Sequence, residues 1–238
     1  MAKNSLKPTL SQTFRIAHYP QAKGSEPDFS AALARSHKAE QEGRWEDACE
    51  IRFAAVQQLV ELLPEDEPIE LDWEDEHTRD AIVLLHSSAV DFFLVGDWEM
   101  AAAQLEMVLD IDSDDHLEAT SLLAFVYAAM GEWESLDDLL PDLDDKSPEK
   151  SLVVLWSGYL RTGEIDKKAL ATFRRYHATY LEEWCAEEHP TDAKYVADIS
   201  SDRPSREALA RELWLQTEHL WRANGEFIAK LKAERWPF

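Results

Sequence analysis

The chain of 238 residues is 45% hydrophobic and 10% aromatic, with nine Trp and only seven Gly. This composition excludes a disordered chain, and so little glycine favours helices joined by short turns over a β-rich fold. Its two cysteines, Cys49 and Cys185, are too few for a disulfide framework, and no apolar run is long enough to cross a bilayer, so we predict a cytoplasmic protein.

The net charge of −24 is concentrated in the middle of the chain. Residues 1–40 carry a net charge of +3, and residues 146–238 carry fifteen Lys/Arg and fifteen Asp/Glu. Residues 41–145 carry thirty Asp/Glu and three Lys/Arg, a net charge of −27. Acid this localised indicates a local role rather than a general adaptation to salt. It also argues against direct binding of nucleic acid, whose phosphates require a basic surface.

Residues 1–24 form a basic segment without any Asp or Glu, and its two prolines predict an extended arm. Its basic residues are Lys3, Lys7, Arg15 and Lys23. Such an arm is either a frayed terminus or a segment that lies against the acidic middle of its own or a neighbouring chain. In the second case its apolar anchors are Phe14, Ile16 and Tyr19.

Helical periodicity and turn residues then predict four helical hairpins over residues 25–187, with Ser25 as the first N-cap. Each hairpin turns at a glycine that can close a helix with a positive φ. These glycines are Gly43, Gly96, Gly131 and Gly163. The expected helices are 25–42, the Gly43 turn to 63, 77–95, 98–110, 114–130, 133–140, 149–162 and 165–187.

An acidic insert, residues 64–76, separates the first hairpin from the second. Its charged and aromatic residues are Glu65, Asp66, Glu67, Glu70, Asp72, Trp73, Glu74, Asp75 and Glu76. A block of like charge favours a solvated loop, because the charges repel one another. Against that, Ile69, Leu71 and Trp73 provide apolar side chains with which the insert could dock.

Residues 188–238 are expected to be a linker followed by one long helix, about 205–233. Its large apolar residues recur every seven positions and form a seam. They are Leu213, Trp214, Leu220, Trp221, Phe227 and Ile228. An apolar seam of this width must be covered. We expect it to cap the helical array, and a homodimer through the same helix is the alternative.

The spacing of 35 and 32 residues between the last three turn glycines, with an aromatic residue two places after Gly96 and Gly131, resembles the tetratricopeptide repeat (TPR) family. The best-matching residues of the second hairpin are Ala89, Phe92, Gly96, Trp98, Ala101, Leu105 and Val108. Those of the third are Leu123, Ala124, Tyr127, Gly131, Trp133 and Leu136. The resemblance implies an all-α superhelix of about four hairpins with a C-terminal capping helix.

In that family the first helices of successive repeats line a groove that accepts a peptide or a helix. Mapped by position, the resemblance implies that the groove residues are His37, Glu40, His86, Val90, Phe93, Glu118, Ser121, Phe125 and Leu160. For each of these, ordinary packing is the alternative role.

No motif for catalysis, phosphate binding or metal binding is complete. Asp110, Asp112 and Asp114 begin like a calcium loop, but the glycine and the final glutamate that such a loop needs are missing. We therefore expect no enzyme activity, no metal and no cofactor. The leading hypothesis is a non-enzymatic scaffold or chaperone-like adaptor whose acidic middle binds a basic protein or peptide. The alternatives are a nucleic-acid mimic that inhibits a DNA- or RNA-binding protein and a structural homo-oligomer.

Overall fold

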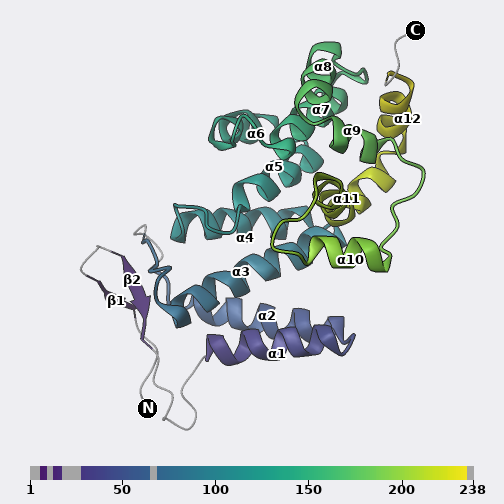
Figure 1. The fold of residues 1–238 in the computed structure, drawn as a ribbon. Coiled ribbons are helices and arrows are strands. Elements are labelled where there is room, and N and C mark those ends of the chain that lie inside the picture. Colours follow the sequence, from purple (N-terminus) through teal and green to yellow (C-terminus); the bar gives the residue numbers. More distant parts are fainter. Residues whose placement is uncertain (1–5, 10–12, 18–27, 65–68, 235–238) are drawn as a thin grey trace. The chain divides into compact units, whose positions relative to one another are not determined.

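A computed structural model describes residues 6–9, 13–17, 28–64 and 69–234 (Figure 1). These residues form twelve α-helices and one sheet of two short strands, so the predicted all-α class is confirmed. Helices and strands form two units, residues 1–126 (unit 1) and residues 127–238 (unit 2). None of the described helices combines the length and the apolarity that crossing a bilayer requires.

Unit 1 is built from two helical hairpins and the start of a further helix. Its helices are α1 (Phe29–Gln41), α2 (Trp45–Val60), α3 (Glu76–Val95), α4 (Trp98–Ile111) and the first part of α5 (Ala119–Met130). Helix α3 packs against α1, α2 and α4, and α1 packs against α2. Ser30 and Phe29 at the start of α1 contact His77 at the start of α3. Because α1 and α3 also pack against each other, the two helices run in the same direction, and α2 runs antiparallel to both.

The turns and caps of these helices follow local chemistry. The four turn glycines have φ between +73° and +78°, and each separates two helices as predicted. Asp75 and Asp97 cap α3 and α4 by accepting a bond from a backbone N–H of the first turn. Helix α1 begins at Phe29 with Asp28 as its N-cap, whereas the expected cap Ser25 lies outside the described residues.

The N-terminal segment forms a short sheet, and its second strand is hydrogen-bonded to the acidic insert. Strand β1 (Leu6–Pro8) pairs antiparallel with β2 (Phe14–Ile16). The Phe14 N–H donates to the Glu70 carbonyl (2.7 Å), and the Asp72 N–H donates to the Phe14 carbonyl (2.8 Å). The Leu71 N–H also donates to the carbonyl of Ile111, the last residue of α4 (2.8 Å). Residues 14–16 therefore lie against the acidic insert of the same chain.

The prediction that the acidic insert is a solvated loop is wrong for residues 69–76. Leu71 is buried between β2 and the end of α4, with 2% of its surface exposed. The burial of the Leu71 side chain and the backbone bonds of residues 70–72 to Phe14 and Ile111 outweigh the repulsion among the neighbouring carboxylates, of which Glu74 and Glu76 are exposed. Residues 65–68, with Glu65, Asp66 and Glu67, lie outside the described part of the chain.

Unit 2 contains the remaining helices. They are the end of α5, α6 (Trp133–Leu139) with a 3₁₀ turn over Leu140–Asp142, α7 (Pro148–Thr162), α8 (Lys167–Tyr176), α9 (Ala178–Trp184), α10 (Ala193–Ile199), α11 (Arg206–Ala223) and α12 (Gly225–Glu234). Helix α7 packs against α8, and α11 packs against α9, α10 and α12.

Three predicted helix boundaries are wrong. The helix expected over 165–187 breaks at His177, and the helix expected over 205–233 breaks at Asn224, both with non-helical backbone angles. The expected linker contains α10. Helix α5 begins at Ala119 rather than near Asp114, because Asp115 has φ +50° and its carboxylate accepts bonds from the backbone of the first turn of α5.

The aromatic seam of the terminal segment forms the core of unit 2. The Trp221 ring lies 5.2 Å from the Trp156 ring and 5.6 Å from the Trp184 ring, centroid to centroid. Trp214 contacts Trp184, also at 5.2 Å, and Phe227 is fully buried. Edge-to-face pairs of this kind stabilise a core beyond simple burial. The aromatic residues that a dimer contact would use are thus packed inside the unit.

Candidate protein-binding surface

The residues predicted to line a groove come from helices of both units. His37 and Glu40 lie on α1, and His86, Val90 and Phe93 lie on α3. Glu118 precedes α5, which carries Ser121 and Phe125, and Leu160 lies on α7 in unit 2. His37 and Glu118 are exposed, and Val90, Ser121 and Leu160 are half-buried.

Phe93 and Phe125 belong to the core rather than to an accessible groove. Their exposed fractions are 1% and 2%. Phe93 contacts Trp98 on the next helix at 5.8 Å, so it holds the second hairpin together. A partner could not reach either ring without opening the fold.

Glu40 has a structural role in the first hairpin. It accepts a bond from Arg52 of α2, and Arg52 Nη1 also donates to Asp91 Oδ1 of α3 at 2.8 Å. The Arg52 side chain is only 6% exposed, so it joins α1, α2 and α3 through a nearly buried ion network. Burial raises the pKa of Asp91 above its usual value although Arg52 acts in the opposite direction.

His86 is a polar residue of the predicted groove whose pKa is shifted by burial. Burial lowers its pKa below the ordinary value of 6.5, and the Asp115 charge only partly offsets this. A neutral imidazole at pH 7 adds neither attraction nor repulsion for a charged partner. His86 thus contributes shape rather than charge to this face of α3.

The described part of the acidic insert is held by its own side chains. The Trp73 ring stacks on the His116 imidazole at 4.4 Å and an angle of 4°. His116 Nδ1 bonds the buried Asp112 carboxylate at 2.6 Å, and Glu70 accepts from the Ser113 N–H. Asp72 accepts from the Glu74 N–H, while Glu74 and Glu76 are exposed. The insert therefore presents its acid from a fixed position.

Helix α2 carries a surface that the sequence reading missed. Trp45, Phe53 and Val60 are exposed by 63%, 38% and 44% of their surface. Phe53 contacts Phe92 of α3 at 6.0 Å, and Val95, one turn further along α3, is 77% exposed. We call these five residues the apolar band. Trp45 stands two places after Gly43, as Trp98 and Trp133 do after their turn glycines, and nothing local in the sequence distinguishes an exposed tryptophan at this position from a packed one.

A groove of about 590 Å³ lies on the other side of α2, between it and α1. Its floor is formed by alanines, among them Ala32 and Ala55, which are buried. Asp28, Arg35 and Glu50 stand at its rim, so the groove is lined by small side chains with charge around them.

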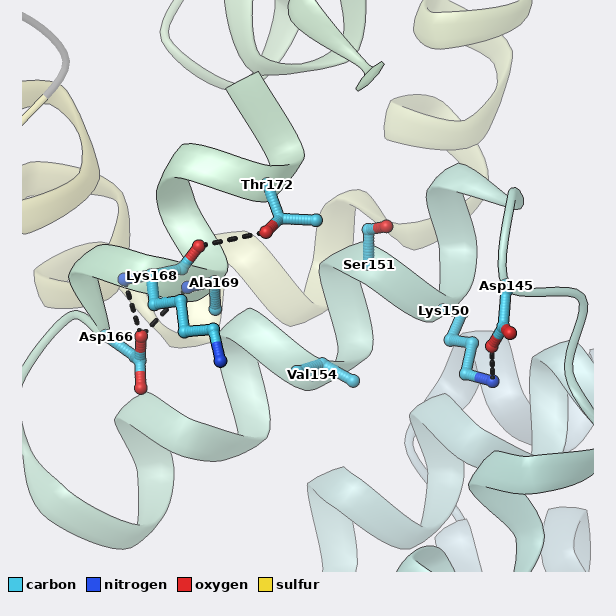
Figure 2. Close-up of a pocket in the computed structure, with 8 residues that line it drawn as sticks. All are labelled: Asp145, Lys150, Ser151, Val154, Asp166, Lys168, Ala169 and Thr172. Carbon is cyan, nitrogen blue, oxygen red and sulfur yellow. Dashed lines mark hydrogen bonds and ion pairs between the residues drawn. The ribbon is translucent and has the colours of Figure 1, made fainter. Parts of the chain in front are cut away.

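In unit 2 a groove of about 410 Å³ separates α7 from α8 (Figure 2). Asp166 caps α8 by accepting from the backbone of Lys168 and Ala169, and Lys150 Nζ binds Asp145 Oδ1 at 2.5 Å. Both carboxylates of the groove are thus engaged in structural bonds.

A nearly buried polar cluster of unit 2 centres on Glu183. Its carboxylate accepts from Arg211 Nε (2.8 Å) and bonds His189 Nδ1 (2.7 Å), and the His189 ring stacks on Trp214 at 4.0 Å. Burial alone would raise the pKa of Glu183, but Arg211 and His189 together lower it. The cluster ties the segment after α9 to α11. Among the described residues, no group of His, Cys, Asp or Glu side chains converges as a metal site requires.

Comparison of the chain with protein-family models, with curated proteins and with solved structures finds no match.

Proposed function

We propose that the chain is a non-enzymatic scaffold or chaperone-like adaptor that binds a basic protein or peptide through unit 1. The observation that carries this proposal is the charge of that unit. Residues 1–126 contain 26 Asp/Glu and nine Lys/Arg, a net charge of −17. A surface of one sign raises the rate at which an oppositely charged partner associates.

Two cations of unit 1, Arg44 and Arg52, are already engaged by carboxylates of the same unit. Arg52 is nearly buried in its network with Glu40 and Asp91. Arg44 pairs with Glu42 and Asp47, so its charge is already compensated locally. The carboxylates of Glu46 and Glu50 on α2 and of Glu99 and Asp110 on α4 are exposed to solvent.

The helix arrangement of unit 1 supports a TPR-like scaffold. Consecutive hairpins turn at glycines with positive φ, and α3 packs against both helices of the preceding hairpin. Contacts of this kind, repeated from one hairpin to the next, are how helical repeat proteins build an extended binding surface. The superhelix and the assignment to the TPR family remain part of this proposal.

The test measures binding of a fluorescent lysine-rich peptide to the full chain at low salt and at about 0.5 M salt, where screening is strong. We expect binding that weakens at least about tenfold with salt, and no binding of the same peptide with glutamate in place of lysine. Replacing Glu46, Glu50 and Glu61 by Gln should weaken binding. The matched control replaces Glu188, Glu207 and Glu226, three exposed residues of unit 2, and should bind like the wild type. Equal binding of both peptides, or binding indifferent to salt, contradicts the proposal.

A further inference from the structure

Each of the first three hairpins has a tryptophan two residues after its turn glycine. The first hairpin differs from the next two in where this side chain lies. In the second and third hairpins the Trp98 and Trp133 rings lie 3.5 Å from the position that a Cβ atom would occupy on Gly96 and Gly131. Both rings therefore fold back over their own turn and are half-buried. In the first hairpin nothing lies within 4 Å of the equivalent position on Gly43, and Trp45 is 63% exposed.

Trp45 is also the first member of the apolar band. Along α2 it is followed by Phe53 and Val60, with the half-buried Cys49 between the two aromatic residues. Because α2 runs opposite to α3, the start of α2 and the end of α3 lie at the same end of unit 1 (Figure 1). Phe92, near the end of α3, contacts Phe53 of α2, and Val95 follows it one turn later, so both extend the band. A run of exposed large apolar side chains on neighbouring helices is typical of an interaction surface.

One edge of this band is acidic. Glu46, Glu50 and Glu61 lie on the solvent side of α2 next to the apolar stripe, since helical spacing places them about 20–100° around the axis from Phe53 and Val60. All three are exposed, and no ion pair is recorded for them among the described residues. The nearest cation on the helix, Arg44, already pairs with Glu42 and Asp47.

We infer that the apolar band docks an amphipathic helix of a partner protein that carries Lys or Arg along one edge. This inference rests on the proposed function and names the face and the shape of the ligand. The band follows α2 over the 16 residues from Trp45 to Val60. This is about 22 Å, which matches a partner helix of about four turns. A helix is favoured over an extended peptide because it satisfies its own backbone N–H and C=O groups against an apolar surface.

The test uses a labelled peptide of about 18 residues made of Leu, Ala and Lys, with leucines at helical spacing and lysines along one edge. A scrambled peptide of the same composition has the same charge but no apolar face. We expect the helical peptide to bind the full chain at least about tenfold more tightly than the scrambled one. The double variant Trp45→Ala, Phe53→Ala should lose most of this difference. The control variant Tyr176→Ala, Val196→Ala, which removes two exposed apolar side chains of unit 2, should keep it.

A charge swap tests the acidic edge independently of packing. The triple variant Glu46→Lys, Glu50→Lys, Glu61→Lys should bind the lysine peptide more weakly and gain binding to the peptide with Glu in place of Lys. Because these residues are exposed, the variant should fold like the wild type, which circular dichroism checks.

The outcomes separate this inference from the function on which it rests. If both peptides bind equally, with salt sensitivity, and the Trp45→Ala, Phe53→Ala variant binds like the wild type, then the inference is wrong while the proposed function stands. If no lysine peptide binds at low salt, both are wrong. If light scattering shows that the full chain self-associates and that Trp45→Ala makes it monomeric, the occupant of the band is a second copy, which also overturns the inference.

Discussion

The two units use the same residue types in opposite ways. In unit 2 the tryptophans Trp156, Trp184 and Trp221 are buried against one another and form the core. In unit 1 Trp45 and Phe53 lie on the surface, and the core is filled by Ala, Leu, Ile and single Phe residues. Aromatic content in a sequence thus does not distinguish a core from a binding surface, since both need large apolar side chains.

The same contrast holds for charge. Unit 2 carries 22 Asp/Glu and fifteen Lys/Arg, and its cations reach acids elsewhere in the unit, as Arg161 does with Asp137 and Arg211 with Glu183. Unit 1 has far fewer Lys and Arg than Asp and Glu, so its negative electrostatic field extends into solvent. Under the proposed function, unit 1 is the part that binds the partner, and unit 2 balances more of its charge internally. Four predictions can break or sharpen this comparison.

The largest effect should come from Trp221→Ala in unit 2. Trp221 is 2% exposed, contacts four aromatic neighbours and donates from Nε1 to Thr217 Oγ1 at 2.9 Å. Removing a buried Trp should lower the free energy of unfolding by about 4 kcal/mol. Urea unfolding followed by circular dichroism measures this. Trp45→Ala is the matched control and should change stability by less than about 0.5 kcal/mol. Equal losses for both would remove the contrast between the units.

In unit 1 the largest loss should follow Arg52→Met. This change leaves Glu40 and Asp91 facing each other without their cation in a nearly buried site. Breaking a buried network in this way costs about 3 kcal/mol. The control Arg44→Met removes an exposed cation and should cost less than about 1 kcal/mol. Thermal unfolding compares them, and a stable Arg52→Met protein would show that the network does not hold the three helices.

Two glycine substitutions should have effects of opposite sign. Gly96→Ala places a side chain at φ +78° and should destabilise unit 1 by about 1–2 kcal/mol. Gly158 lies inside α7 with open space around it, so Gly158→Ala should stabilise unit 2 by about 0.5–1 kcal/mol through helix propensity. Chemical unfolding of both variants tests this, and a stabilised Gly96→Ala protein would contradict the turn geometry.

The smallest effect concerns His116, which the Trp73 ring covers. The His116 Nδ1–H donates to the Asp112 carboxylate, and this bond raises the pKa of His116 above its ordinary value of 6.5. The charged imidazole therefore stabilises the fold below pH 6.5, and this contribution disappears as the pH rises through the raised pKa. A histidine titration by NMR should give a pKa above 6.5 that falls in Asp112→Asn. An unchanged pKa in that variant would show that Asp112 does not hold the imidazole.

Much of the helical framework could be read from the sequence because it depends on neighbouring residues. A glycine at Gly96 or Gly131 can take the positive φ that ends a helix, and Asp97 and Ser147 offer side-chain oxygens that cap the next helix. Acid without matching base over residues 41–145 likewise predicted an anionic surface. The helix break at His177 carries no glycine or proline by which it could be recognised. At the second break the Asn224-Gly225 pair is a turn signal, but the seven-residue apolar repeat that runs through it favoured one continuous helix.

Only the tertiary structure decided which side chains of this framework meet solvent. The repeat pattern places Trp45, Trp98 and Trp133 in equivalent positions, yet one is exposed and two fold over their turns, because burial depends on what lies opposite a side chain. Leu71 is buried in a segment whose composition predicts a loop, because β2 and the end of α4, each distant in sequence, supply its backbone partners. Local chemistry determines where a helix starts and stops, and long-range packing determines which of its faces is left for a partner.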